Sequence, residues 1–301
     1  MNKIIQRLYL LLYAVIGNLL KIRVNFDLYI RRRISVAPNV DASLVVSLTT
    51  YGCRAYHSVQ YTLYSLLKQD VRPAHILLWL DEKEFNNDCL PKPLAILKDM
   101  GITICFCENI RSYKKLIPTL QLHPDKNIIT VDDDLYYSSN LTKELLALHH
   151  QYPDAVIAEA CAIPQHNSDG KFKPYFQWPK YHLVGKDFPS PSMSIFPIGY
   201  GGVFYPAGTF DNEIFRQDIF TKLCPIADDI WFYIQGIRCH RPKVMDVQSK
   251  VRYYHVDLIR QAFRKDRLMQ SNNTEGQNDI QLRQLMEHYQ LTSEGMLPDS
   301  M

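Results

Sequence analysis

Short apolar runs alternate with segments of helical hydrophobic spacing through the first half of the chain. Fully apolar runs of this length are typical of buried parallel strands, and the longer segments repeat apolar residues every three or four positions. The runs cover Ser43–Tyr51, Ala74–Asp81, 102–108 and 127–131, and the segments between them cover Ser58–Gln69, Pro91–Gly101 and Ser112–His123. This order predicts an α/β fold with a doubly wound, mainly parallel sheet flanked by helices.

The second half is less regular. Aromatic residues and prolines crowd 171–182 and 186–208, which predicts loops and short antiparallel strands, a small irregular region suited to an acceptor, around a cleft. We expect Trp178 and Trp231 to line that cleft. Further elements are predicted as a helix at Ala227–Gly236, edge strands at 243–248 and 250–256, and an amphipathic helix at Asn278–Tyr289.

The N-terminal segment differs in both charge and hydrophobicity. Its apolar run Leu8–Leu20 falls short of the ~20 residues that span a bilayer. Residues 1–33 contain seven Lys or Arg and one acid, Asp27. This pattern favours a helix lying on an anionic membrane surface; the alternatives are docking on its own domain or a partner, and a true span. The predicted domains are this basic segment (1–38), a main domain (39–260) and a C-terminal helical extension (261–301).

Composition narrows the function classes. The chain has 301 residues, 47% apolar and 22% charged, which is typical of a globular protein. Its net charge is +3, but beyond residue 33 it is about −3, which argues against a nucleic-acid-binding body. No pair of the seven cysteines has zinc-ribbon spacing, so free thiols in a reduced compartment are favoured over a metal site. We therefore expect a cytoplasmic protein, peripheral on the inner face of the cell membrane.

Three consecutive aspartates, Asp132 to Asp134, follow the β-branched run at 127–131. Because side chains alternate near a strand end, Asp132 and Asp134 can face one side while Asp133 turns away. Two carboxylates at this spacing suit Mg²⁺ or Mn²⁺, which in turn can hold a diphosphate. The alternatives are a solvated acidic turn or a helix N-cap.

Five motifs in order resemble bacterial glycosyltransferases of the GT-A fold, closest to family-2-like enzymes that build surface polysaccharide and lipopolysaccharide. They are VSLTTYGCR, SYKKLIP, ITVDDDLYY, PIGYGGVFYP and ADDIW, and the resemblance covers roughly Leu44 to His255. It implies a nucleotide-diphosphate sugar as donor, Mn²⁺ or Mg²⁺ as cofactor, and a glycan acceptor that we expect to be lipid-linked.

The resemblance also implies roles for individual residues. The metal ligands would be Asp132, Asp134 and His255, and the donor would be held by Thr49, Thr50, Tyr51, Arg54, Lys114, Lys115, Asp132, Asp133, Gly201 and Gly202. Simpler interpretations stay open: an exposed helix face for the two lysines, a tight turn for the glycines, and a structural role for the histidine.

The acid pair Asp228–Asp229 matches a position that supplies the catalytic base in inverting members of this family. Transfer to a sugar hydroxyl requires a group that removes its proton, which we assign to Asp229, with Asp228 holding an acceptor hydroxyl or orienting the loop. Retention of configuration stays possible, and acids stabilised by a helix dipole are the simpler alternative. Rival functions are a nucleotidyl- or phosphotransferase and a non-catalytic carbohydrate-binding protein.

Overall fold

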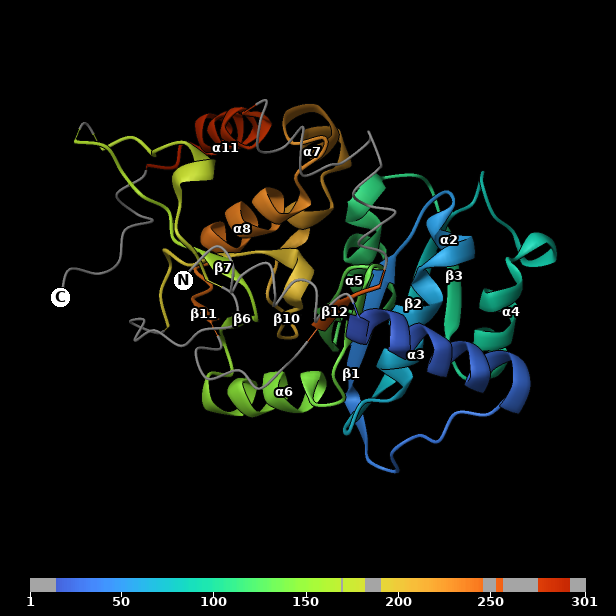
Figure 1. Cartoon of the computed structure of the whole chain (residues 1–301). Coiled ribbons are helices and arrows are strands. Elements are labelled where there is room, and N and C mark those ends of the chain that lie inside the picture. Colours follow the sequence, from blue (N-terminus) through green and yellow to red (C-terminus); the bar gives the residue numbers. More distant parts are fainter. Residues whose placement is uncertain (1–14, 169, 182–190, 246–252, 257–275, 293–301) are drawn as a thin grey trace. The chain divides into compact units, whose positions relative to one another are not determined.

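The computed structural model describes residues 15–168, 170–181, 191–245, 253–256 and 276–292 (Figure 1). The chain divides into two compact units, each built from separate stretches of sequence. Unit 1 comprises Met1–Asn109, Asp132–Lys143 and Lys250–Lys265, and unit 2 comprises Ile110–Val131, Glu144–Ser249 and Asp266–Met301. The predicted division into 1–38, 39–260 and 261–301 stays a prediction.

Unit 1 contains three parallel strands, β1 (Val40–Thr49), β2 (Arg72–Asp81) and β3 (Thr103–Cys107), paired in that order. The central residues of β1 and β2 are buried, as their apolar runs predict. The helices α2 (Arg54–His57), α3 (Val59–Leu67) and α4 (Lys92–Asp99) and the 3-10 turn η2 (Asn87–Cys89) connect them, and α3 packs on β2 (Figure 1). The carboxyl end of β1 therefore leads directly into α2.

A short antiparallel pair completes unit 1. The strand β5 (Leu135–Tyr137) pairs with β12 (Tyr253–His255), so that Leu135 lies opposite His255. The backbone N–H of Val256 donates to the carbonyl of Asp134 at 3.1 Å. This pairing brings a late stretch of sequence beside the aspartates.

The described part of the N-terminal segment is helical from residue 15 to 25 and continues as the π-helical turn η1 (Phe26–Arg31). Its inward side chains Val24 and Leu28 are fully buried. Among the described residues, no helix has both the length and the apolar character that a membrane crossing requires. The positions Lys3 and Arg7 and most of the run Leu8–Leu20 lie outside the described residues.

Unit 2 contains a mixed sheet in the order β11 (Lys243–Met245), β6 (Val156–Ala158), β10 (Val203–Tyr205) and β4 (Asn127–Thr130). The strand β10 runs antiparallel to both of its neighbours, whereas β11 is parallel to β6. A second, antiparallel sheet pairs β7 (Cys161–Ala162) with β8 (Lys180–Tyr181) and β9 (Phe196–Pro197). These sheets confirm the α/β class and the short antiparallel strands predicted for the second half.

The helices of unit 2 pack around α8 (Asp228–Arg238), which contacts α11 (Gln277–His288). The remaining helical elements are η3 (Arg111–Lys115), α5 (Ile117–Leu122), α6 (Leu141–Gln151), η4 (Tyr175–Gln177), η5 (Gly199–Gly201), η6 (Asn212–Phe215) and α7 (Gln217–Leu223). In Figure 1, α7, α8 and α11 form one group. The sequence GYGG thus becomes η5, just before β10.

The prediction that Trp178 and Trp231 line a cleft is wrong. Both indoles are buried, with 2% and 0% exposure. Their N–H groups donate to the backbone carbonyls of Lys173 (2.8 Å) and Ile214 (3.2 Å). Since a buried indole needs such a partner, both residues belong to the hydrophobic core.

Candidate functional site

The aspartates at the end of β4 are organised around Asp133, which is buried with 4% exposure. Its carboxylate accepts hydrogen bonds from the side chains of Thr50 and Arg54, and its backbone carbonyl accepts one from Thr62 at 2.8 Å. Thr50 directly follows β1, and Arg54 begins α2. The segment that was predicted to hold the nucleotide therefore also holds the aspartates in place.

Arg54 also contacts Asp134, with 3.3 Å between guanidinium nitrogen and carboxylate oxygen. Its guanidinium lies 5.2 Å from the centre of the Tyr51 ring, which is 38% exposed. Burial lowers the pKa of Arg54, but the charges of Asp133 and Asp134 outweigh it, so the net shift is upward. Arg54 is thus a positive charge that offsets part of the acidic cluster.

Asp133 differs from its two neighbours in solvent exposure, as the alternation of side chains predicts. Burial raises the pKa of Asp133, against the opposing effects of the Arg54 charge and the Thr50 hydrogen bond. Asp132 and Asp134 are both partly exposed. Asp133 therefore faces inward, and the two residues of the D-x-D pair remain nearer to solvent.

His255 lies beside this cluster, on the strand that pairs with the residue after Asp134. Its Nδ1 is buried and has no hydrogen-bond partner among the described residues. Burial lowers the pKa of its imidazole, which favours the neutral form that binds metals. Neutral imidazole and carboxylate oxygens together are a donor set that fits Mn²⁺. No group of three or more potential metal-binding side chains is clustered within the described part of the chain.

Thr49 shows how the end of β1 is fixed. Its hydroxyl donates to the carbonyl of Trp79 on the neighbouring strand β2 at 2.9 Å. Thr50 has no exposed surface, whereas Tyr51 is exposed. Of these three residues, only Tyr51 presents a large part of its side chain to solvent in the described conformation.

A second cluster of charged residues lies in unit 2, where the first turn of α8 meets η3. Lys115 and Asp228 form an ion pair of 3.0 Å in which both side chains are about 90% buried or more. Lys114 is also buried, with 2% exposure, so the interpretation of these lysines as an exposed helix face is wrong. Asp228 and Asp229 both lie in the first turn of α8, where the helix dipole favours negative charge.

The glycine loop η5 covers the second acid of this pair. The backbone N–H of Gly199 donates to the Asp229 carboxylate at 3.2 Å. A Cβ at Gly199 would lie 2.7 Å from Asp229 Oδ1 and 2.9 Å from Lys115 Nζ, both far too close. A side chain at this position would therefore have to displace the Asp229 carboxylate and the Lys115 ammonium, which glycine avoids.

The other two glycines in this loop have separate constraints. A Cβ at Gly201 would lie 3.1 Å from the Cβ atoms of Glu159 and Ala160, and Gly202 has a φ of +109°. The loop thus fits closely against protein atoms as well as turning tightly. The expectation that Gly201 and Gly202 contact the donor stays a prediction.

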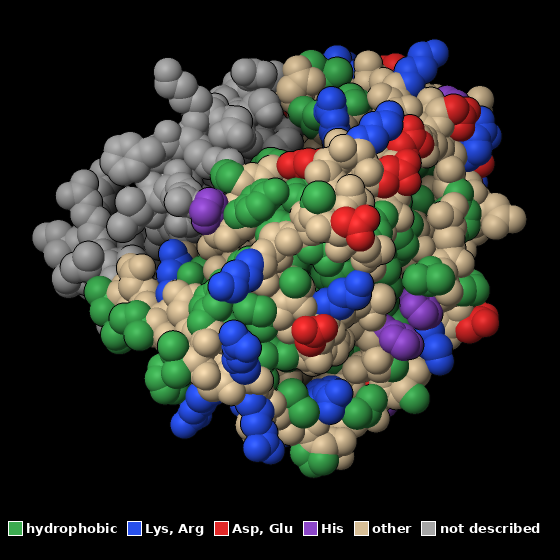
Figure 2. All heavy atoms as spheres, turned by 90° about the vertical axis from the view of Figure 1, so that its right-hand side faces the viewer, with side chains coloured by type: hydrophobic (Ala, Val, Ile, Leu, Met, Phe, Trp, Pro, Cys, Tyr) green, Lys and Arg blue, Asp and Glu red, His purple; other side chains and the backbone are tan. Residues whose placement is uncertain are grey.

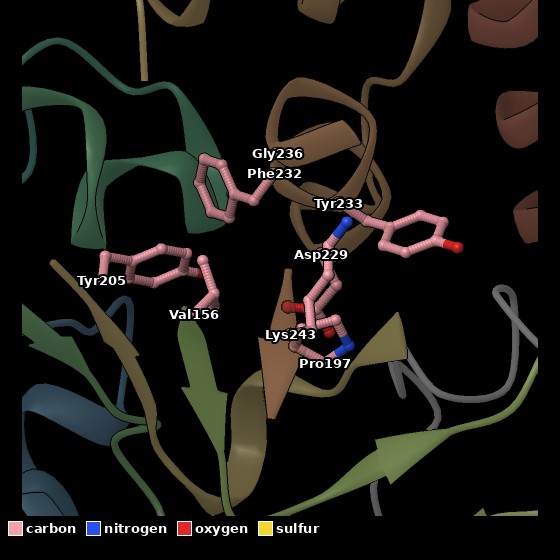
Figure 3. Close-up of a pocket in the computed structure, with 8 residues that line it drawn as sticks. All are labelled: Val156, Pro197, Tyr205, Asp229, Phe232, Tyr233, Gly236 and Lys243. Atoms are coloured by element: carbon pink, nitrogen blue, oxygen red, sulfur yellow. The ribbon is translucent and has the colours of Figure 1, made fainter. Parts of the chain in front are cut away.

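Asp229 also lines a small cavity of about 10 Å³, near the size of one water molecule (Figure 3). The other lining residues are Val156, Pro197, Tyr205, Phe232, Tyr233, Gly236 and Lys243. The cavity is too small for a sugar ring.

The charge of Asp229 adds to burial in raising the pKa of the Tyr205 phenol.

Lys243 is a residue that the sequence interpretation missed. Burial lowers the pKa of its ammonium to about 7. The ammonium lies 4.8 Å from the Tyr233 ring centre and 3.5 Å from the carbonyl oxygen of Met193. The available signal was the apolar pair that follows Lys243 in the predicted edge strand, Val244 and Met245, both of which are buried. Glu159, buried beside the glycine loop, was also missed.

Comparisons with known proteins find similarity only at the level of solved structures. No protein-family model and no curated protein sequence matches the chain. The synthetase of CMP:2-keto-3-deoxy-manno-octonic acid in complex with CTP is 10% identical, with a TM-score of 0.41 over 68% of this chain and 88% of that one. S. aureus TarS 1–349 is 13% identical, with a TM-score of 0.40 over 72% of this chain and 60% of TarS 1–349. Similarity this distant assigns neither a family nor an activity to this chain.

Proposed function

We propose that the protein is a metal-dependent glycosyltransferase that moves a sugar from a nucleotide-diphosphate donor to a lipid-linked glycan. The observation that carries the proposal is the pairing of β12 with β5. It sets the backbone of His255 next to the segment that carries Asp134, and the Nδ1 of His255 is buried with no hydrogen-bond partner among the described residues. This arrangement follows from the fold rather than from the motif, because residues 134 and 255 are distant in sequence.

The donor side of the proposal belongs to unit 1. Asp132, Asp134 and His255 would hold Mn²⁺ or Mg²⁺, which when bound would neutralise the diphosphate of the donor. Tyr51 has exposed ring surface that can stack on a nucleotide base, and Arg54 lies next to that ring. Thr50 and Arg54 fix Asp133 and so set the backbone direction of the two flanking aspartates.

The proton-removing side of the proposal belongs to Asp229 in unit 2. The acceptor hydroxyl attacks the anomeric carbon and gives its proton to the Asp229 carboxylate, while the bond from that carbon to the nucleotide diphosphate breaks. A single displacement of this kind inverts the anomeric configuration. The buried Lys115–Asp228 pair would orient the turn that carries the base.

The deciding experiment is a thermal-shift screen of nucleotide-diphosphate sugars with and without Mn²⁺. A ligand that prefers the folded protein raises its Tm by mass action. We expect one nucleotide sugar to raise the Tm only with Mn²⁺, and Asp134→Asn to abolish that shift. The matched control is Asp99→Asn, an exposed aspartate of α4. A shift in Asp134→Asn as large as in the wild type would refute the metal role.

Product analysis separates this activity from its rivals. A glycosyltransferase releases a nucleoside diphosphate and forms a glycoside, whereas a nucleotidyltransferase releases pyrophosphate. A non-catalytic carbohydrate-binding protein would bind glycan equally well with EDTA and without nucleotide. We place the reaction in the cytoplasm, since all seven cysteines are free, and at the inner face of the cell membrane, as the basic and apolar N-terminal segment favours.

A further inference from the structure

The outward face of the N-terminal helix carries a row of exposed apolar side chains. They recur every three or four residues and therefore lie on one side of the helix: Val15 (50% exposed), Leu19 (61%), Ile22 (68%), Phe26 (49%) and Ile30 (69%). We call this row the apolar stripe. Contiguous exposed apolar residues of this kind mark a surface that contacts another apolar phase or protein.

The opposite face of the same helix is already occupied by unit 1. Val24 and Leu28 are fully buried, and Asp27 accepts a hydrogen bond of 2.5 Å from the Tyr64 hydroxyl of α3. A Cβ at Gly17 would lie 2.7 Å from the backbone carbonyl oxygen of His255, so the helix backbone lies directly against β12. The apolar stripe is consequently held outward, because the packed face cannot turn over without losing these contacts.

Basic side chains accompany the apolar stripe. Arg23, Arg31, Arg32 and Arg33 are all exposed. The single acid between residues 15 and 33 is Asp27, which is buried. Figure 2 shows Lys and Arg side chains interspersed with hydrophobic ones at the lower left of its view. The helix therefore presents hydrophobic area and positive charge together, with no exposed negative charge from residues 15 to 33.

We propose that the apolar stripe and its arginines dock the protein on the surface of a bilayer that contains anionic lipids. An amphipathic helix of this kind lies in the plane of the interface, with its apolar face among the acyl chains and its arginines at the headgroups. A second copy of the same face is a poorer occupant, since a symmetric contact would bring arginines against arginines. Anionic headgroups would instead neutralise these positively charged arginines, which would repel one another in a symmetric dimer.

The test uses the full chain and co-sedimentation with two kinds of vesicle, phosphatidylcholine alone and phosphatidylcholine mixed with phosphatidylglycerol. We expect strong binding to the mixed vesicles, weak binding to the neutral ones, and a loss of binding as salt is raised. Equal binding to both kinds of vesicle, or none to either, would overturn the proposal. The assay needs no turnover, so its outcome is independent of the proposed glycosyltransferase activity.

Variants locate the surface. The triple change Leu19→Ser, Ile22→Ser, Ile30→Ser should weaken partitioning at least about tenfold, since each apolar side chain adds to binding. The matched control, Leu122→Ser, Phe176→Ser, Ile280→Ser, removes exposed apolar groups from unit 2 and should bind like the wild type.

Arg23→Gln with Arg33→Gln should weaken binding to mixed vesicles, whereas exposed Lys83→Gln with Lys222→Gln should not. Unchanged binding in the stripe variant would reject the proposal.

A gain-of-signal variant guards against loss of folding. Ile22→Trp places an indole in the middle of the apolar stripe, and its fluorescence should shift to the blue and be quenched by lipids labelled in the acyl chain. Sedimentation velocity without lipid tests the alternative that a second copy of the chain covers the apolar stripe. A concentration-dependent dimer that the stripe variant abolishes, with no fluorescence change on vesicles, would identify a second copy as the occupant and overturn the membrane proposal.

Discussion

The two acidic clusters of this protein are stabilised in different ways. In unit 1, Asp133 and Asp134 share one guanidinium, that of Arg54, and Asp133 is bonded by Thr50 as well. In unit 2, Asp228 pairs with Lys115, while Asp229 accepts a backbone N–H from Gly199. In the first cluster one guanidinium contacts two acids, which we call the shared arrangement. In the second cluster a lysine contacts Asp228 and a backbone N–H contacts Asp229, which we call the divided arrangement.

This difference fits the two roles that we propose for these clusters. Three adjacent carboxylates and one guanidinium form a group that attracts a further cation, as a metal-diphosphate site requires. A carboxylate that accepts a backbone N–H, as Asp229 does, can also accept a proton from a hydroxyl group. The shared arrangement suits binding, and the divided arrangement suits proton removal by Asp229 with Asp228 as its fixed neighbour.

The largest effect that tests this comparison is expected for Asp229→Asn. An asparagine keeps the hydrogen bond from Gly199 but cannot take a proton, so sugar transfer should fall by about 10³-fold, within the range attributed to general bases. The Mn²⁺-dependent thermal shift with the donor should persist, in contrast to Asp134→Asn. Steady-state transfer assays and the thermal-shift assay measure the two quantities separately.

Asp218→Asn is the matched control for this variant, because Asp218 lies in the first turn of α7 but is exposed. It should transfer sugar at the wild-type rate. Full activity in Asp229→Asn would remove Asp229 as the base. Loss of the donor-induced shift in that variant would mean that the divided arrangement serves binding as well.

Much of the first half of the fold was predictable from periodicity. The run Ala74–Asp81 became β2, and the segment Pro91–Gly101 became α4, because buried apolar runs and amphipathic segments have few alternative placements. The segment Ser112–His123 instead forms η3 and α5. Pro118 follows the break, at the start of α5, where its missing N–H costs nothing.

The sequence predicted which residues belong to the candidate site, but it did not predict which of their side chains contact one another in the two clusters. The alternation of Asp132 to Asp134 correctly predicted that Asp133 turns away from its neighbours. Nothing in the local sequence indicated that Arg54 would contact Asp133 or that Lys115 would be buried with Asp228. These ion pairs join residues far apart in the chain, and such contacts depend on the fold and on which side chains lose water.

The next largest expected effect is the loss of stability when one partner of each ion pair is removed. Lys115→Gln leaves the Asp228 carboxylate buried without its ion pair, so we expect the free energy of unfolding to fall by about 3 kcal/mol. Arg54→Gln should cost less, about 2 kcal/mol, because Arg54 is partly exposed and Asp133 keeps its bond to Thr50. Urea unfolding at neutral pH measures both.

The loss of stability in Arg54→Gln should also depend on pH. Burial already raises the pKa of Asp133, and removing Arg54 removes a charge that lowers it. The loss of stability in Arg54→Gln is then complete above the folded-state pKa of Asp133, and it shrinks as pH falls towards the lower, unfolded-state pKa because Asp133 takes up a proton. Arg111→Gln, which removes an exposed arginine, is the control. Equal losses in the two variants at every pH would remove the distinction between shared and divided stabilisation.

The smallest expected effect concerns Lys243, which lines the same cavity as Asp229. The pKa of its ammonium is about 7 in the folded protein against an ordinary 10.5, so between these values the unfolded chain holds one more proton. Stability should therefore rise with pH through that window, and the burial penalty should be complete below it. Lys243→Met should stabilise the protein by about 2 kcal/mol near pH 6 and progressively less towards pH 10, whereas exposed Lys222→Met should change nothing. Chemical unfolding across this pH range measures whether the free energy of unfolding rises or falls in each variant. Destabilisation of Lys243→Met at pH 6 would contradict this prediction, because it would show that the folded protein stabilises the ammonium at this place.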